Sequence, residues 1–87
     1  MEIVFLPGAK DDLNDWVKAG DKAILKKIAT LIDAITKTPY EGAGKPEPLK
    51  YRLAGCWSRR INKEHRLVYE VIGNSILIHS LKGHYKI

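Results

Sequence analysis

The clearest periodic pattern in the chain runs through residues 22–37, KAILKKIATLIDAITK. Its apolar residues recur at intervals of four, three and four positions, at Ile24, Ile28, Leu31 and Ile35. This spacing forms one apolar stripe along a helix, which is typical of a helix packed on a sheet. Asp21 suits an N-cap and Pro39 ends the pattern. We therefore predict an amphipathic helix that contributes its apolar face to the core.

A strand and a shorter helix are predicted before this segment. Residues 2–6, EIVFL, are β-branched and aromatic, as strands prefer. Pro7 interrupts the strand, and residues 9–20 have the composition of a short helix. Gly20 suits the C-terminal cap of that helix.

The second half of the chain changes to a strand-like pattern. Residues 38–48 hold three prolines and two glycines in eleven positions, too many for regular structure. Extended segments are then predicted at 49–55, 56–61, 65–72 and 75–81, the last two joined by a turn at Gly73–Asn74. The sum is a single α+β domain over residues 1–87. We expect an N-terminal strand and two helices packed on one face of a mostly antiparallel sheet.

The hairpin register brings chemically distinctive residues together. With a two-residue turn at Gly73–Asn74, Arg66 is expected opposite Leu81. His84 and Tyr85 follow Leu81 by three and four residues. Hairpin geometry therefore predicts that Arg66 lies near these two residues.

The preceding strand supplies one more arginine, but the sequence leaves open which one. Arg59 and Arg60 point to opposite faces because side chains alternate along a strand. An even loop before the next strand places Arg59 on the face of Arg66, and an odd or bulged loop places Arg60 there. Glu47 lies between two prolines, which favour a stiff, extended segment leading into these strands.

The charge distribution favours an anionic partner. Residues 1–44 carry six Lys and seven acids, whereas residues 45–87 carry nine Lys and Arg and three acids. All four arginines fall within residues 52–66. A basic surface of this kind attracts polyanions such as RNA.

Other totals exclude several classes of protein. Apolar residues make up 45% of the chain, enough for a core. The single cysteine, Cys56, permits no disulfide framework, and three histidines without paired ligand spacing predict no metal site or cofactor. No apolar run approaches the ~20 residues of a membrane span, and the N-terminus does not resemble a signal peptide. We therefore expect a cytoplasmic protein without a membrane partner.

A carboxylate, a histidine and clustered arginines are the groups that metal-free RNA cleavage requires. A base removes the proton of a ribose 2′-hydroxyl, an acid protonates the departing 5′-oxygen, and cations stabilise the phosphorane. Each candidate also has a simpler interpretation. Glu47 suits a solvated loop, Arg66 a charge that protects a strand edge, and His84 and Tyr85 the end of a domain. On these residues alone, a basic RNA- or protein-binding module without catalysis remains an alternative.

Several motifs resemble the YoeB-like toxins of the RelE superfamily. They are P-[FY]-E-G-x-G-K-P-E-P-L-K, L-x-G-x-W-S-R-R-I, E-H-R-L-V-Y and a late H-Y, and they cover about half of the chain. The resemblance implies an mRNA interferase, the toxin of a type II toxin–antitoxin system, which cleaves messenger RNA in the ribosomal A site. ParE-like relatives, which poison DNA gyrase, lack this Glu–Arg–His set.

The same resemblance implies a role for each candidate residue. Glu47 matches the general base and His84 the general acid. Arg66 and Arg60 match the arginines that hold the scissile phosphate, so Arg60 is expected beside Arg66. Tyr85 matches the tyrosine that orients the substrate. Lys50 matches a basic position that assists binding. Apart from the resemblance, Arg59 is also expected to contact RNA, as a member of the same basic segment.

The resemblance also implies partners, namely a cognate YefM-like antitoxin, the 70S ribosome with mRNA, and a second copy of the chain. Operator DNA is expected to bind only the toxin–antitoxin complex. Two features depart from the family pattern. Lys86 and Ile87 follow the His-Tyr pair, and Cys56 stands where an aromatic residue is common. We expect the first to alter activity and the second to loosen packing without removing the chemistry.

Overall fold

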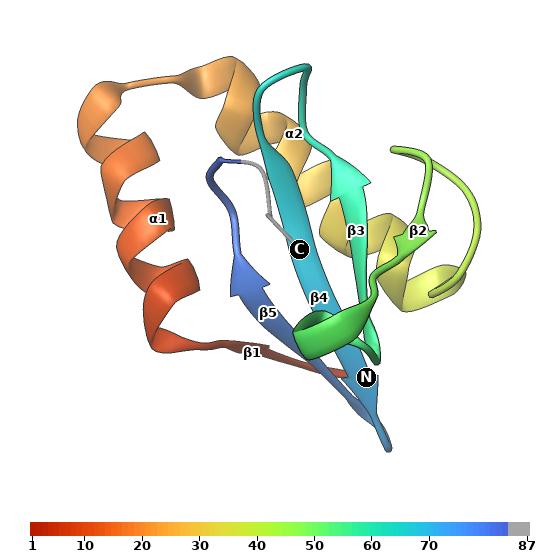
Figure 1. Ribbon diagram of the computed structural model, residues 1–87. Coiled ribbons are helices and arrows are strands. Elements are labelled where there is room, and N and C mark those ends of the chain that lie inside the picture. Colours follow the sequence, from red (N-terminus) through yellow and green to blue (C-terminus); the bar gives the residue numbers. More distant parts are fainter. Residues whose placement is uncertain (84–87) are drawn as a thin grey trace.

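The computed structural model describes residues 1–83. Two helices, α1 (Pro7–Ala19) and α2 (Lys22–Lys37), accompany a five-stranded sheet of order β1-β5-β4-β3-β2 (Figure 1). The strands are β1 (Glu2–Phe5), β2 (Glu47–Pro48), β3 (Cys56–Arg60), β4 (Arg66–Ile72) and β5 (Ser75–Ser80). Strand β1 runs parallel to β5, and the other neighbours are antiparallel. The predicted α+β architecture with a mostly antiparallel sheet is confirmed. The expected positions of His84 and Tyr85 lie outside the described residues.

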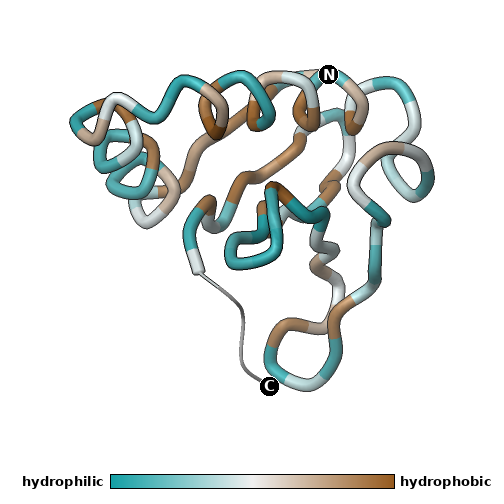
Figure 2. Tube along the Cα trace, turned by 90° about the horizontal axis from the view of Figure 1, so that it is seen from above, coloured by the Kyte–Doolittle hydropathy of each residue, from teal (hydrophilic) through white to brown (hydrophobic). Residues whose placement is uncertain are grey.

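The main core lies between the helices and one face of the sheet. The predicted stripe of α2 is buried at all four positions. It meets strand residues that are wholly buried, namely Leu67, Tyr69, Ile76 and Ile78. Figure 2 shows hydrophobic residues along the central strands and on one side of the helices, with hydrophilic residues in the loops. Neither helix is long and apolar enough to cross a membrane, judged over residues 1–83.

The helix ends follow local rules, with one correction. The Asp21 carboxylate accepts a hydrogen bond from Ile24 N–H at 3.1 Å, and Gly20 caps α1 with φ of 68°. We predicted that Pro7 only interrupts the strand and that the helix starts at residue 9, but α1 begins at Pro7 itself. A proline suits this position because the first N–H of a helix has no intrahelical acceptor.

Residues 49–55 were expected to be extended, and this prediction is wrong. Tyr51–Leu53 form a single 3₁₀ turn, η1, in which Tyr51 has a positive φ of 57°. A second, smaller cluster forms there from Leu49, Cys56 and Val68, with Leu53 packed against it. The segment after β2 therefore covers part of the sheet face opposite the helices.

The β4–β5 hairpin contains a bulge that the sequence pattern did not predict. Tyr69 pairs with Ile78, but its neighbour Val68 pairs with Ser80. His79 is therefore an extra residue in β5, and the register changes by one position beyond it.

Because of the bulge, Arg66 lies opposite a different part of the chain from the one that we predicted. The turn at Gly73–Asn74 is where we expected it, because Ile72 pairs with Ser75. Arg66 is not opposite Leu81, however, and its N–H donates to the Gly83 carbonyl at 3.1 Å. The bulge thus brings a later part of the chain beside the start of β4.

Candidate functional site

Three of the predicted residues share the sheet face that the helices leave uncovered. Glu47 of β2 pairs with Ser58 of β3, and Arg60 of β3 pairs with Arg66 of β4. Directly paired residues point to the same face, as do residues two apart on one strand. Leu67, beside Arg66, points into the main core. Glu47, Arg60 and Arg66 therefore lie on the opposite face.

The loop between β3 and β4 decides which arginine joins this face. It contains five residues, 61–65, between the last residue of β3 and the first of β4. The Asn62 side chain accepts hydrogen bonds from the N–H groups of Glu64 and His65, each at 2.8 Å, which shapes the turn. An odd loop places Arg60 beside Arg66, in line with the family resemblance.

Arg66 is half-buried and contacts the neighbouring strand β3. Its Nη1 lies 3.5 Å from the hydroxyl of Ser58, which is fully buried. Glu47 is the partner of Ser58 on the other side, in β2. Ser58 thus lies between Glu47 in the neighbouring strand and the Arg66 guanidinium on the same face, and both Glu47 and Arg60 are exposed.

The last described residues are held in place by hydrogen bonds from the β3–β4 loop and from α1. Gly83 N–H donates to Nδ1 of His65 at 2.8 Å, and the His65 ring packs edge-on against Trp16 at 4.7 Å. Trp16 Nε1 donates to the Leu81 carbonyl at 2.9 Å. Asp12 accepts from the Leu81 N–H at 2.9 Å. The chain is therefore fixed beside Arg66 up to the residue before His84.

Sequence reasoning assigned no role to His65, and the structure gives it one. Its ring links the β3–β4 loop, α1 and the backbone at Gly83. The local sequence holds no signal for this contact, because its partners are 49 and 18 positions away.

Arg59 does not lie on the candidate face, which corrects its expected role in binding RNA. The residue is fully buried on the helix side of the sheet. Its guanidinium donates to the Tyr69 hydroxyl at 3.2 Å and to the carbonyls of Thr38, Glu41 and Ala43. Burial raises the pKa of Tyr69, and the adjacent guanidinium opposes that rise. Through these hydrogen bonds, Arg59 stabilises the loop after α2 against the sheet.

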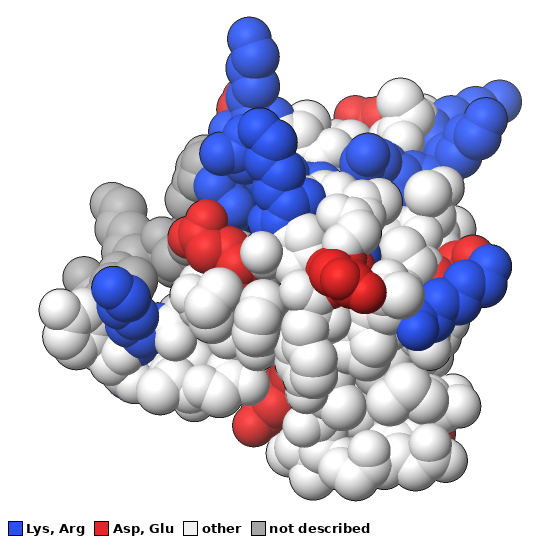
Figure 3. Space-filling view, turned by 90° about the vertical axis from the view of Figure 1, so that its right-hand side faces the viewer, with Lys and Arg blue, Asp and Glu red and all other residues white. Residues whose placement is uncertain are grey.

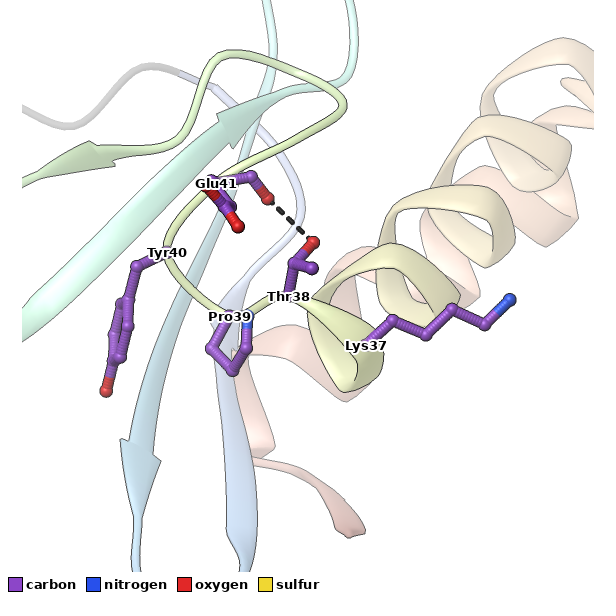
Figure 4. A pocket seen from close by; sticks show the side chains of 5 residues that line it. All are labelled: Lys37, Thr38, Pro39, Tyr40 and Glu41. Atoms are coloured by element: carbon purple, nitrogen blue, oxygen red, sulfur yellow. Dashed lines mark hydrogen bonds between the residues drawn. The ribbon is translucent and has the colours of Figure 1, made fainter.

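The same loop bounds a pocket of about 280 Å³ (Figure 4). Its lining residues are Lys37, Thr38, Pro39, Tyr40 and Glu41. Thr38 Oγ1 donates to the Glu41 carbonyl at 2.9 Å, which closes the turn. The pocket contains none of the described candidate residues, so we assign it no chemistry.

Positive charge gathers on the side of the molecule that carries β2 and β3. Figure 3 shows Lys and Arg side chains grouped in the upper part of this side, while the lower part is mostly uncharged. Lys50 is exposed and follows Glu47 by three residues. This distribution suits contact with the phosphates of RNA.

A second group of polar side chains lies on the same face, farther along the strands. Cys56 Sγ is 3.8 Å from His79 Nε2, which is 3.0 Å from Glu70 Oε1. Burial, together with the negative charge of Glu70, raises the pKa of the Cys56 thiol. The bulge that turns His79 toward Glu70 is the feature that the sequence did not show.

Comparison with known proteins identifies the same family that the sequence motifs resemble. Residues 5–85 match the family model described as YoeB-like toxin of bacterial type II toxin-antitoxin system. The chain is 49% identical over 85 residues to Toxin YoeB of Escherichia coli K12, covering 98% of this chain and 100% of the relative.

Solved structures agree over the whole fold. The YoeB/ParE toxin from Agrobacterium tumefaciens superposes with a TM-score of 0.92 at 41% identity, covering 98% of this chain and 100% of that one. YoeB from Staphylococcus aureus, 48% identical over 98% of each chain, superposes with a TM-score of 0.87 in a heterotetrameric complex with YefM. The same toxin solved as a dimer gives a TM-score of 0.88.

Proposed function

This chain belongs to the YoeB-like toxins of bacterial type II toxin–antitoxin systems, and from this premise we propose that it is a ribosome-dependent endoribonuclease that cleaves mRNA in the A site. The proposed reaction is an internal transfer at one phosphodiester. The ribose 2′-oxygen bonds to phosphorus, the bond to the 5′-oxygen breaks, and the products are a 2′,3′-cyclic phosphate and a 5′-hydroxyl.

Each step of the transfer has a group in this chain. Glu47 accepts the proton of the 2′-hydroxyl as the new P–O bond forms, and His84 donates a proton to the departing 5′-oxygen. Arg66 and Arg60 stabilise the negative charge of the phosphorane. Tyr85 orients the nucleotide, and Lys50 contacts the neighbouring backbone. The side chains supply the acid, the base and the counter-charge, so the mechanism uses no cofactor.

The arrangement around Ser58 is the observation that carries the proposal. Glu47 pairs with Ser58 from β2, and Arg66 Nη1 lies 3.5 Å from its hydroxyl. Arg60 pairs directly with Arg66 on the same face. A carboxylate on one side and two guanidinium groups on the other suit a site where a proton is removed next to a phosphate.

The position of Gly83 supports the role of His84. Arg66 N–H donates to the Gly83 carbonyl at 3.1 Å, and Gly83 N–H donates to His65. His84 follows Gly83 directly in the chain, so the general acid is proposed to act beside the arginine that holds the phosphate. An unperturbed imidazole has a pKa of about 6.5 and exchanges protons readily at neutral pH.

The proposed partners follow from the substrate and from the relatives. Ribosome-bound mRNA supplies the polyanion for the basic side of the molecule and places the activity in the cytoplasm. YoeB from Staphylococcus aureus has been solved with YefM and as a dimer. We propose a YefM-like antitoxin that covers the candidate site, a homodimer of the toxin, and operator binding by the toxin–antitoxin complex alone.

Single-turnover cleavage on programmed ribosomes tests the proposal. Glu47→Ala, Arg66→Ala and His84→Ala are each expected to lower the cleavage rate by ~10²-fold or more, since each removes a proton-transfer or charge-stabilising group. Lys26→Ala, an exposed change on α2, is the matched control and leaves the rate unchanged. Sequencing of the cleaved ends should recover the 2′,3′-cyclic phosphate. Wild-type binding to ribosomes without any cleavage would instead support the non-catalytic binding module.

A further inference from the structure

The group formed by Cys56, Glu70 and His79 lies outside the proposed catalytic site. Cys56 of β3 pairs with Glu70 of β4, and the bulge in β5 brings His79 to the same face. The three residues thus come from three adjacent strands of one sheet. Such a scaffold holds side chains more rigidly than a loop does.

The ligand atoms of these three side chains lie near the separations that a small metal ion needs. Sγ of Cys56 and Nε2 of His79 are 3.8 Å apart, and Nε2 is 3.0 Å from Oε1 of Glu70. The ligand atoms of all three residues lie within 4.8 Å of one another. Neighbouring ligands of a tetrahedral Zn²⁺ ion are roughly 3.3–3.6 Å apart, given its usual bond lengths to sulfur, nitrogen and oxygen. Small side-chain adjustments therefore suffice to place one ion between them.

We propose that Cys56, Glu70 and His79 bind one Zn²⁺ ion, with water in the fourth position. Thiolate and imidazole are ligands that zinc prefers over magnesium or calcium, and a carboxylate completes a three-residue set. The cysteine is buried, while the histidine and glutamate are half-buried and give an ion access from solvent.

Electrostatics favours a cation at this point. The Glu70 carboxylate has its Oε1 3.0 Å from Nε2 of His79, and the Cys56 sulfur lies 3.8 Å from the same nitrogen. An ion among these atoms makes attractive contacts with the carboxylate and with the sulfur, which releases its proton on binding. It also joins β3, β4 and β5 at the bulge, so we expect binding to stabilise the bulged register.

This inference does not depend on the proposed nuclease activity, and its test measures binding alone. The full-length chain, freed of metal by dialysis against a chelator, is titrated with Co²⁺ as a spectroscopic probe for zinc. We expect one Co²⁺ per chain, a thiolate-to-cobalt charge-transfer band in the near ultraviolet, and displacement of the band by one equivalent of Zn²⁺. We also expect the melting temperature to rise with added Zn²⁺.

Single substitutions test the ligands. Cys56→Ser is expected to abolish the charge-transfer band and to weaken Zn²⁺ binding at least ~10-fold in a chelator competition, and Glu70→Gln and His79→Gln to weaken binding by a similar factor. His65→Gln is the control that removes a histidine outside the group, whose ring packs against Trp16, and binding should persist.

Two results would overturn the inference. One is a wild-type chain that binds Co²⁺ without the charge-transfer band or does not bind it at all. The other is equal Zn²⁺ affinity in the wild type and in the ligand variants. Should Cys56→Ser fail to fold by circular dichroism, the glutamate and histidine variants decide the outcome alone.

Discussion

Arg59 and Arg60 are adjacent residues of one type that the strand separates into two environments. Arg59 is fully buried, and its guanidinium donates to Tyr69 and to three backbone carbonyls of the loop after α2. Arg60 is exposed on the other face, opposite Arg66. Because alternate side chains of a strand point to opposite faces, each residue has a role that its neighbour cannot take.

This separation predicts different effects of the same substitution. Arg59→Ala is expected to lower the free energy of unfolding by about 3 kcal/mol or more, because it leaves buried acceptors without donors. Arg60→Ala should change the free energy of unfolding by no more than about 0.5 kcal/mol, as exposed substitutions usually do. Urea denaturation of both variants measures the difference. Equal losses of stability in the two variants would show that the hydrogen bonds of the Arg59 guanidinium do not stabilise the fold.

At the scale of elements, α2 is the part of the chain whose local signals agree most fully. Its apolar stripe is buried, and Asp21 accepts a hydrogen bond from Ile24 N–H at its first turn. The helix also covers the sheet face behind the candidate residues. Its stability is therefore expected to influence the loop that follows it and, through Arg59, strand β3.

The N-cap provides a test at this scale. Asp21→Ala is expected to destabilise the fold by ~1 kcal/mol, because it removes the acceptor for the Ile24 N–H, which has no partner within the helix. Asp33→Ala breaks only an exposed ion pair with Lys37, at 3.0 Å, and should cost less than ~0.5 kcal/mol. Thermal melting of the two variants supplies the comparison. A smaller effect at position 21 than at position 33 would contradict this role of the cap.

At the scale of the whole molecule, distant segments fix the chain beside the candidate site. His65 accepts a hydrogen bond from Gly83 N–H and packs against Trp16 of α1, while Arg66 binds the Gly83 carbonyl. These contacts connect the β3–β4 loop, the first helix and the end of the described chain. We regard His65 as a positioning residue for the histidine that follows Gly83.

His65→Ala therefore tests whether the proposed reaction depends on this positioning of the chain at Gly83. We expect the single-turnover cleavage rate to fall by ~10²-fold while ribosome affinity stays constant, since a small displacement of a reacting group is costly. Lys63→Ala, an exposed change in the same loop, should leave both quantities unaltered. An unchanged rate, or a loss confined to affinity, would refute the positioning role.

The sequence by itself determined both helices and four of the strands, because helix periodicity, strand alternation, caps and the Gly73–Asn74 turn depend on neighbours within a few positions. It did not determine the short strand β2 or the 3₁₀ turn at Tyr51–Leu53. Its motifs also identified Glu47, Arg60 and Arg66 as candidate residues, and the strand pairing places all three on one face of the sheet. Tertiary structure alone decided the bulge at His79 and the burial of Arg59. Each depends on which strand lies opposite and on the side chains packed across it. Such contacts join residues far apart in the chain, so no local pattern of residues specifies them.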